Sequence, residues 1–169
     1  KLDGFRAIHA QFEQQTAQDT EVHSGELWIE KPNRFRIVTE MPWQQTLISD
    51  GSTFWNYDAD LEQVTITEME HDLLKFPILL FSSTEAELEK TFSVSTFRGE
   101  VNTVYVLEPR GEQQFFKQMT IVFNGNLPKT ISIVDSLAQK TRIRLIQADI
   151  ASQPPAELFQ FVPPSGTDI

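Results

Sequence analysis

Residues that could carry out acid–base or nucleophilic chemistry are few and scattered in this sequence. It has no cysteine, which excludes disulfides, thiolate nucleophiles and sulfur-ligated metal sites. The histidines, His9, His23 and His71, lie far apart, and the first two occupy the polar positions of alternating segments, which favours solvated side chains over metal ligands or bases. The 7 glycines are isolated from one another, so no phosphate-binding loop is predicted. We therefore expect no catalytic residue, no metal site and no cofactor.

Two groups of charged residues resemble binding sites at first sight. The string from Tyr57 to Glu62 is rich in carboxylates, but it lacks the central glycine and the flanking helices of a calcium-binding loop, so acidic turn residues are the better interpretation. Arg142 and Arg144 alternate with Ile143 and Leu145, which is typical of the solvent-facing side of a strand rather than of an anion site. Neither group predicts a ligand.

Length and charge narrow the class of protein. A chain of 169 residues is expected to form one domain, residues 1–169. Its 24 acidic against 14 basic residues give a net charge of −10, which disfavours binding to nucleic acid and to anionic membrane surfaces. The longest apolar run, Phe76 to Phe81, is far shorter than a membrane-spanning helix, so we expect no stable membrane insertion. The chain starts at Lys1 without a recognisable export signal, so either none is needed or it has been removed.

Alternation of apolar and polar residues, which indicates half-buried strands, dominates the sequence. In the segment 117–123, Met119, Ile121 and Phe123 share one face, and Gln118 and Thr120 share the other. We predict about ten or eleven antiparallel strands joined by hairpin turns, with one apolar face and one solvent-exposed face. The first strand begins near residue 8, and the others comprise residues 22–29, 34–38, 45–48, 54–57, 62–67, 92–97, 103–107, 117–123, 130–134 and 141–146.

One long interval, from His71 to Lys90, breaks this strand pattern and indicates helices. Pro77 suits a first helical position ahead of an apolar run, and Thr84 with Glu87 forms a capping box for a second short helix through Leu88. A sheet of this many strands curls through its own twist, so short helices can plug its concave face and leave an apolar cavity. The 13 phenylalanines suit such a dry interior. Sandwiches and closed barrels fit the same periodicity.

Lys31 is a charged residue in an apolar position. It has the same parity as Leu27 and Ile29 and directly precedes Pro32, so an unbroken strand would point its side chain toward the apolar face. A buried ammonium needs hydrogen-bond partners, and the carbonyl groups at the C-terminal end of a covering helix would supply them. The alternative is a rim lysine that extends into solvent. The residues alone leave both interpretations open.

Several short motifs follow one another along nearly the whole chain. They are residues 8–14 (IHAQFEQ), 25–36 (GELWIEKPNRFR), 49–51 (SDG), 54–57 (FWNY), 61–65 (LEQVT) and 159–168 (FQFVPPSGTD). In order and spacing this series resembles the LolA family, the periplasmic carriers of outer-membrane lipoproteins in Gram-negative bacteria. Each motif is weak by itself, and the specificity of the match comes from the whole series.

The resemblance implies a mainly β fold with short helices, an incomplete antiparallel β-barrel of about eleven strands with an α-helical lid over a hydrophobic cavity. It also implies a function without covalent chemistry. The cavity would accept the acyl chains of lipoproteins released by an inner-membrane ABC transporter, and the carrier would deliver them to the outer-membrane acceptor LolB. We accordingly expect a periplasmic carrier of acylated lipoproteins and no enzyme.

Parity and resemblance together assign the site residues. The residues expected to line the acyl cavity are Leu27, Ile29, Phe35, Ile37, Ile48, Met119, Ile121, Phe123, Ile143 and Leu145. The residues expected to form the lid are Leu73, Phe76, Pro77, Ile78, Leu79 and Leu80. In the family, an arginine directly before the motif's proline hydrogen-bonds to the lid and holds the empty form closed. Lys31 occupies that position as the expected latch, with one ammonium in place of a planar five-donor group.

Other functions fit parts of the pattern. A LolB-like acceptor, anchored to the outer membrane, would share the fold, and so would another binding protein for apolar ligands. A purely structural sheet protein would have no cavity and would bind no apolar probe. A lipid hydrolase would need a nucleophile and a base that the motifs do not supply.

Overall fold

The computed structural model describes residues 6–17, 21–31, 33–41, 43–68, 84–110 and 116–167. These residues form eleven strands, one α-helix and one 3₁₀ helix. The strands are β1 (Ala7–Thr16), β2 (His23–Glu30), β3 (Arg34–Met41), β4 (Gln45–Asp50), β5 (Thr53–Asp58), β6 (Gln63–Glu68), β7 (Phe92–Arg98), β8 (Asn102–Pro109), β9 (Phe116–Asn124), β10 (Leu127–Asp135) and β11 (Lys140–Asp149). The helices are α1 (Glu85–Thr91) and η3 (Ala156–Phe159).

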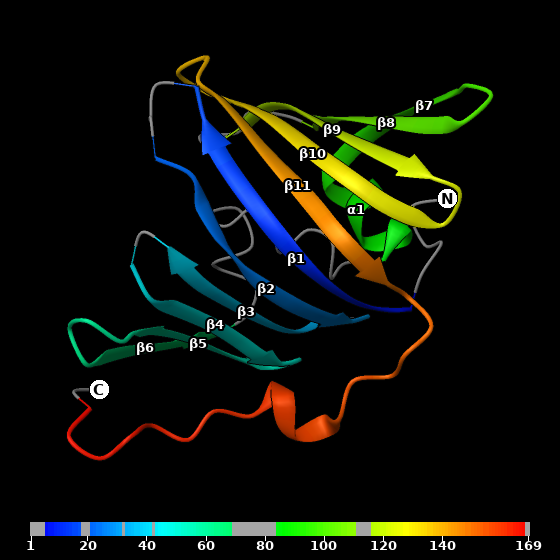
Figure 1. The fold of residues 1–169 in the computed structure, drawn as a ribbon. Helices are drawn as coiled ribbons and strands as arrows, with labels where there is room; N and C mark the ends of the chain where they lie inside the picture. The colour runs from blue at the N-terminus through cyan, green and yellow to red at the C-terminus, as the bar shows by residue number, and fades with distance from the viewer. Residues whose placement is uncertain are drawn as a thin grey trace.

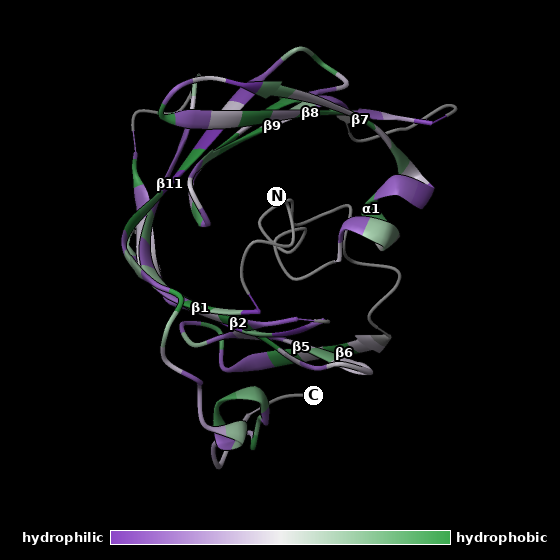
Figure 2. Cartoon of the chain, turned by 90° about the vertical axis from the view of Figure 1, so that its right-hand side faces the viewer, coloured by the Kyte–Doolittle hydropathy of each residue, from purple (hydrophilic) through white to green (hydrophobic). Residues whose placement is uncertain are grey.

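All eleven strands belong to one sheet, in the order β6-β5-β4-β3-β2-β1-β11-β10-β9-β8-β7. Every neighbouring pair is antiparallel. Consecutive strands are neighbours except β6 and β7, which form the two edges of the sheet, and at the centre the first strand pairs with the last. The sheet curves strongly (Figure 1), and the side view shows it wrapping from β6 through β1 and β11 to β7 without closing (Figure 2). The mainly β, open antiparallel architecture expected from the sequence is therefore confirmed.

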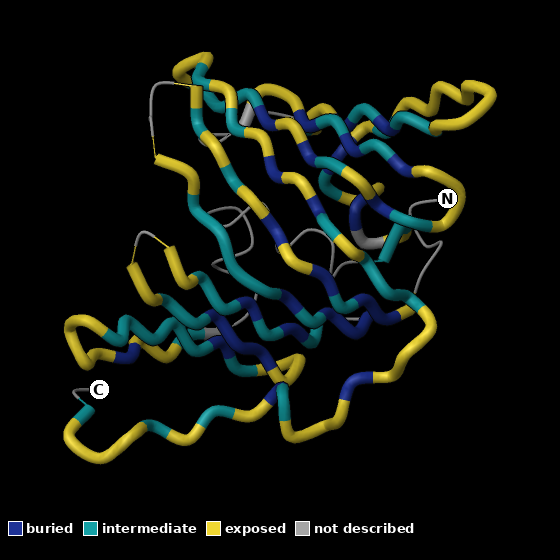
Figure 3. Tube along the Cα trace, in the orientation of Figure 1, coloured by how far each residue is buried: buried dark blue, intermediate teal, exposed yellow. Residues whose placement is uncertain are grey.

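The concave side of the sheet carries the main apolar core. Along the strands buried residues alternate with more exposed ones (Figure 3), as the period of two requires. Registered pairs such as Leu27 with Ile37 and Ile131 with Ile143 put buried side chains on the same face. The core cluster comprises Ile8, Ala10, Phe12, Leu27, Ile29, Phe35, Ile37, Leu47, Phe54, Leu88, Phe92, Tyr105, Leu107, Met119, Ile121, Phe123, Ile131, Ile133, Ile143 and Leu145.

The convex side differs from the sequence expectation at one end of the sheet. There the C-terminal segment crosses the outside of β3 and β4, as Figure 2 shows below the sheet. The Phe161 ring contacts the Tyr57 ring at 5.3 Å, and the Arg36 guanidinium donates to the Leu158 carbonyl at 3.4 Å. Phe159 is buried to 1 % exposure. The prediction of a uniformly solvent-exposed second face is wrong, because this segment covers part of it.

Ile48, which the sequence assigned to the acyl cavity, lies on this covered convex side. In the register Ile48 pairs with Arg36 and Trp55, whereas its neighbours Leu47 and Ser49 pair with Ile37 and Phe35 of the concave face. Ile48 is fully buried and does not belong to the concave core cluster. Its burial comes from the convex side, where η3 packs against β3 and β4. The assignment of Ile48 to the cavity is therefore corrected.

The helix predicted from the capping box is present as α1. The Leu88 amide donates to the Thr84 carbonyl at 3.0 Å, so Thr84 is the residue from which the helix starts. The helix ends at Thr91, three residues beyond the prediction, with Lys90 in the last turn near the negative end of the helix dipole. Leu88 joins the concave core. The other predicted helix, residues 77–81, lies outside the described residues.

Aspartates at strand ends form the turns between strands. The Asp50 carboxylate accepts hydrogen bonds from the Ser52 and Thr53 amides, both at 2.9 Å. Asp58, Asp135 and Asp149 each accept amide hydrogen bonds from the following residues in the same way. The acidic string at Asp58 is therefore a hairpin turn, as predicted.

The close approach of β2 and β3 at Gly25 gives a first test of the register. A methyl group on Gly25 would lie 1.9 Å from the Val38 carbonyl oxygen and 2.9 Å from the Thr39 Cα, both of them backbone atoms. We predict that Gly25→Ala lowers the free energy of unfolding by roughly 2 kcal/mol or more, because the two strands must separate. Thermal unfolding followed by circular dichroism measures the effect, with Ser24→Ala as the control. A Gly25→Ala protein as stable as the control would contradict this register.

The turn at Asp50 gives a second, pH-dependent test. Partial burial pushes the pKa of Asp50 upward, but hydrogen bonds from the Thr53 and Ser52 amides and the Ser52 hydroxyl outweigh it, so the net pKa is lowered. A carboxyl group with a lowered pKa in the folded state stabilises the fold above its unfolded pKa, and this contribution disappears as the pH falls through the folded pKa. We predict that Asp50→Ala costs about 1 kcal/mol at pH 7. The difference from wild type in urea unfolding should shrink below about pH 4, and a difference independent of pH would count against the prediction.

Candidate ligand-binding site

The concave face is the candidate site, because apolar side chains from both halves of the sheet meet there. In one half, Leu27 and Ile29 of β2 pair with Ile37 and Phe35 of β3, and each of the four is at most 2 % exposed. In the other half, the sequence-predicted residues Met119, Ile121 and Phe123 of β9 lie on the same face as Ile143 and Leu145 of β11. All the predicted cavity residues except Ile48 therefore lie on one continuous apolar surface.

Strand β1 joins the two halves and contributes residues that the predicted cavity did not include. Its Phe12 pairs with Leu145 of β11 and with Gly25 of β2. Ile8 and Ala10 are also buried in the concave core. Their alternation with polar residues was visible in the sequence, but the pairing of β1 with β11 was not. Further residues of the face that sequence reasoning missed are Leu47, Phe54, Leu107, Ile131 and Ile133.

Aromatic side chains occupy both ends of the concave face. The Phe35 and Phe54 rings meet edge to face at 5.6 Å, and the Tyr105 and Phe123 rings meet in the same manner at 5.6 Å. Burial raises the pKa of Tyr105, and the Glu85 carboxylate adds to this rise, so the phenol is neutral at physiological pH. Such edge-to-face pairs fix ring orientation and leave a surface suited to apolar ligands.

Few polar side chains lie on the described part of the concave face, among them Tyr105 and Ser49. Ser49 is fully buried there, and its hydroxyl donates to the Asn33 carbonyl at 2.9 Å and accepts from the Gly51 amide at 3.0 Å. Within the described part of the chain, no group of three His, Asp or Glu side chains is placed to hold a metal ion. The face can therefore bind a ligand through burial of apolar surface, which is strong but not directional.

Lys31, the predicted latch, is buried next to this face. It follows the last residue of β2 and is 9 % exposed, and its backbone amide donates to the Arg6 carbonyl at 2.8 Å. Asn33 of the same turn has a φ of 62°, which asparagine tolerates. Among the described residues the buried Asn33 Oδ1 has no hydrogen-bond partner. The burial of Lys31 rules out the alternative of a rim lysine extended into solvent.

The predicted lid cannot be placed relative to this face. Its residues, Leu73, Phe76, Pro77, Ile78, Leu79 and Leu80, fall outside the described residues, as does His71.

The other two histidines are on the outside. His9 stacks on Trp28 with ring centroids 4.8 Å apart and lies 2.7 Å from a Glu26 carboxylate oxygen, and His23 contacts the Trp43 ring edge-on. In the described part of the chain no helix has the length and apolar character needed to cross a membrane.

Comparison with solved structures supports the fold. The crystal structure of MucB superimposes with a TM-score of 0.57 at 15% identity, covering 95% of this chain and 59% of that chain, so this chain spans less than two thirds of MucB. A DUF1329 family protein from Desulfovibrio piger superimposes with a TM-score of 0.54 at 7% identity, covering 94% of this chain and 91% of that one. At such low identities the likeness concerns the fold alone.

Comparison of sequences is more specific. A protein of Alcanivorax borkumensis named outer-membrane lipoprotein carrier protein is 34% identical over 100% of this chain and 83% of its own length. Proteins of the same name from Alkalilimnicola ehrlichii and Legionella pneumophila strain Corby are 35% and 33% identical, covering 99% and 100% of this chain and 78% and 85% of their own lengths. The sequence profile described as outer membrane lipoprotein carrier protein LolA matches residues 3–162. With nearly the whole chain matched in this way, the protein belongs to the LolA family of outer membrane lipoprotein carrier proteins.

Proposed function

We propose that this protein is a periplasmic carrier that binds the acyl chains of lipoproteins released from the inner membrane and delivers them to an outer-membrane acceptor. The observation that carries the proposal is the continuous apolar surface on the concave side of an open sheet, built from β1 to β5 and β7 to β11. The names of the relatives, outer-membrane lipoprotein carrier proteins, support the same function. The ligand-binding residues are the predicted cavity residues other than Ile48.

The concave surface supplies the kind of free energy that a lipid carrier needs. Each buried methylene group contributes about 0.8 kcal/mol, so one 16-carbon chain gains on the order of 10 kcal/mol on leaving water. No bond is made or broken in such binding, so we propose a carrier without enzymatic activity. Because apolar burial is not directional, the face accepts acyl chains irrespective of the protein that is attached to them.

A carrier must also release its ligand. We propose that residues 73–80 form a lid that covers the concave face in the empty form and that Lys31 holds the lid closed. If closure of the empty protein recovers a few kcal/mol, the net affinity for acyl chains falls by the same amount. The burial of Lys31 beside β2 supports a role at the edge of the apolar face.

The partners follow from the direction of transport. We propose that an inner-membrane ABC transporter supplies the lipoprotein and that the outer-membrane acceptor LolB receives it, as in the family that the chain resembles. The net charge of −10 suits a protein that crosses the periplasm, because it opposes adhesion to anionic membrane surfaces between the two transfers.

The first functional prediction is that the protein binds an apolar probe on the concave face. Ile121→Trp fills space on that face, whereas Val122→Trp adds the same side chain at the next position of β9, on the convex side. We expect saturable binding of a fluorescent fatty acid that palmitate displaces, weakened at least about tenfold by Ile121→Trp and unchanged by Val122→Trp. Fluorescence titration measures both affinities.

Ile121→Ala serves as a second concave variant if the larger side chain impairs folding. It removes apolar contact area from the same place, so it should also weaken binding. Circular dichroism confirms that each variant is folded. Equal affinities for the wild type and for folded concave variants would refute the concave face as the binding site.

The second functional prediction concerns Lys31. If its ammonium holds the empty form closed, Lys31→Leu should bind the probe at least as tightly as wild type but release it more slowly to LolB, because the closed empty state loses a polar contact. Lys31→Arg, which keeps the charge, should transfer normally. The measurement is the rate of transfer of an acylated lipoprotein to LolB in vitro. Identical transfer rates for wild type and Lys31→Leu would exclude the latch.

A further inference from the structure

A row of cations follows the convex side of β11. Lys140, Arg142 and Arg144 alternate with the buried concave residues, and all three are exposed. Within the described part of the chain, none of their side chains has a hydrogen-bond or ion-pair partner. By contrast, the Arg34 guanidinium is paired with the Glu30 carboxylate at 3.3 Å. In a protein of net charge −10, this row is a local reversal of the surface charge.

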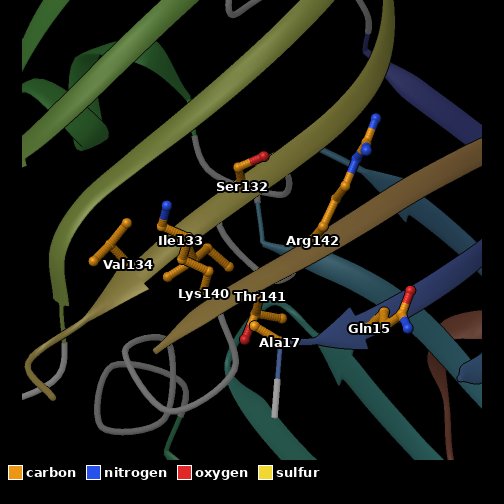
Figure 4. A pocket seen from close by; sticks show the side chains of 8 residues that line it. All are labelled: Gln15, Ala17, Ser132, Ile133, Val134, Lys140, Thr141 and Arg142. Atoms are coloured by element: carbon orange, nitrogen blue, oxygen red, sulfur yellow. The ribbon is translucent and has the colours of Figure 1, made fainter. Parts of the chain in front are cut away.

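A pocket of about 480 Å³ lies beside two of these cations, where β1 and β10 end and β11 begins (Figure 4). Lys140 and Arg142 line it, and Gln15 of β1 and Ser132 of β10 stand opposite Arg142 in the register. A volume of this size is within the range of small-molecule sites, about 300–1,000 Å³. The amide and the hydroxyl are neutral groups that can donate hydrogen bonds to an anion.

The remaining described lining is largely apolar. Val134, which pairs with Lys140, and Ala17 contribute hydrocarbon on the convex side, whereas the side chains of Ile133 and Thr141, which pair with each other, belong to the concave side. Ile133 is part of the concave core cluster, so the pocket lies across the sheet from the apolar core, at the end of these strands. An occupant therefore meets hydrocarbon and cations within the same small volume.

Among the described residues, the carboxylates near this pocket do not neutralise it. No acidic residue is among its described lining. The closest in sequence, Asp135, uses its Oδ1 to accept the Leu137 and Gln139 amides, both at 2.9 Å, and so holds the β10–β11 turn. Glu13 stands opposite Arg144 in the register, beyond the two cations that line the pocket. The positive potential at Lys140 and Arg142 is thus available to a ligand.

From this arrangement we propose that the pocket formed by Gln15, Ser132, Lys140 and Arg142 binds the anionic group, phosphate or carboxylate, of an amphiphile whose hydrocarbon part rests on Ala17 and Val134. Lys140 and Arg142 are two residues apart on one strand, so their side chains leave the same face about 7 Å apart. An oxyanion between them accepts from the ammonium and from the planar guanidinium, which suits phosphate and carboxylate oxygens. The site does not depend on whether the concave face takes acyl chains.

The test compares monododecyl phosphate with the neutral 1-dodecylglycerol, both below their micelle concentrations, and with inorganic phosphate alone. Isothermal titration calorimetry gives the affinity, and ¹⁵N NMR shows whether the amides of residues 132–134 and 140–142 shift. The charge variant is Lys140→Gln with Arg142→Gln. The matched control, Lys90→Gln with Lys129→Gln, removes the same net charge from exposed positions on α1 and β10 outside the pocket lining.

We expect the phosphate amphiphile to shift these amides and to bind about tenfold more weakly to the charge variant, with the control variant within about twofold of wild type. An equal loss in the control variant would show a general effect of net charge and overturn the site. So would unchanged binding in the charge variant, which would place the probe on the concave face. If the wild type bound dodecylglycerol as tightly as dodecyl phosphate, the site would not require an anionic group. If it bound inorganic phosphate as tightly as dodecyl phosphate, the site would not require a hydrocarbon chain.

Discussion

The pairing of the first strand with the last is the constraint on which the rest of the structure depends. Residues of β1 and β11 that lie more than 120 positions apart in the sequence, such as Phe12 with Leu145 and Gln14 with Ile143, are fixed opposite one another. Without this ladder, β2 to β6 and β7 to β10 would be two separate meanders, each with an apolar face exposed. With it, the two faces become one concave surface, and the twist of so many strands bends that surface around its apolar side. The register shifts between His9 and Gln11 of β1, where the facing stretch of β11 from Ile146 to Asp149 is one residue longer and Gln147 has a φ of 54°, and such an irregularity increases local bending.

Much of this could be predicted from the sequence, because a period of two determines which side chains share a face. The alternation around Met119, Ile121 and Phe123 placed them correctly, and the capping box at Thr84 located α1. Alternation assigns parity within one strand, however, and does not say which parity faces the core when both are apolar. Leu47 and Ile48 are adjacent residues of opposite parity, and both are apolar and buried. The sequence therefore offered no basis for deciding which of the two faces the concave core.

The cover over the convex side could not be predicted for a related reason. The segment that contains Phe159 and Phe161 has no alternation of its own, and it packs on strands about a hundred residues earlier through Tyr57 and Arg36. Such contacts depend on tertiary placement, which local propensity does not specify. The consequence is that β3 to β5 are held from both sides. This half of the sheet has a second packed layer, and its concave residues Phe35 and Phe54 rest on a supported scaffold.

The apolar residues that can give affinity for a ligand and the charged residues that can make directional contacts lie in different parts of one sheet. The described part of the concave face is mostly hydrocarbon, apart from groups such as the Ser49 and Tyr105 hydroxyls, so it distinguishes ligands chiefly by how much apolar surface they bury. Directional groups lie elsewhere, with the buried Lys31 after β2 and the exposed row from Lys140 to Arg144 on the convex side of β11. Polar groups placed among the core residues would have been costly to desolvate, whereas the cations of this row remain solvated. A carrier that must accept many different proteins by the same lipid anchor benefits from such a division, because the common hydrocarbon supplies the affinity without a directional contact to any particular protein.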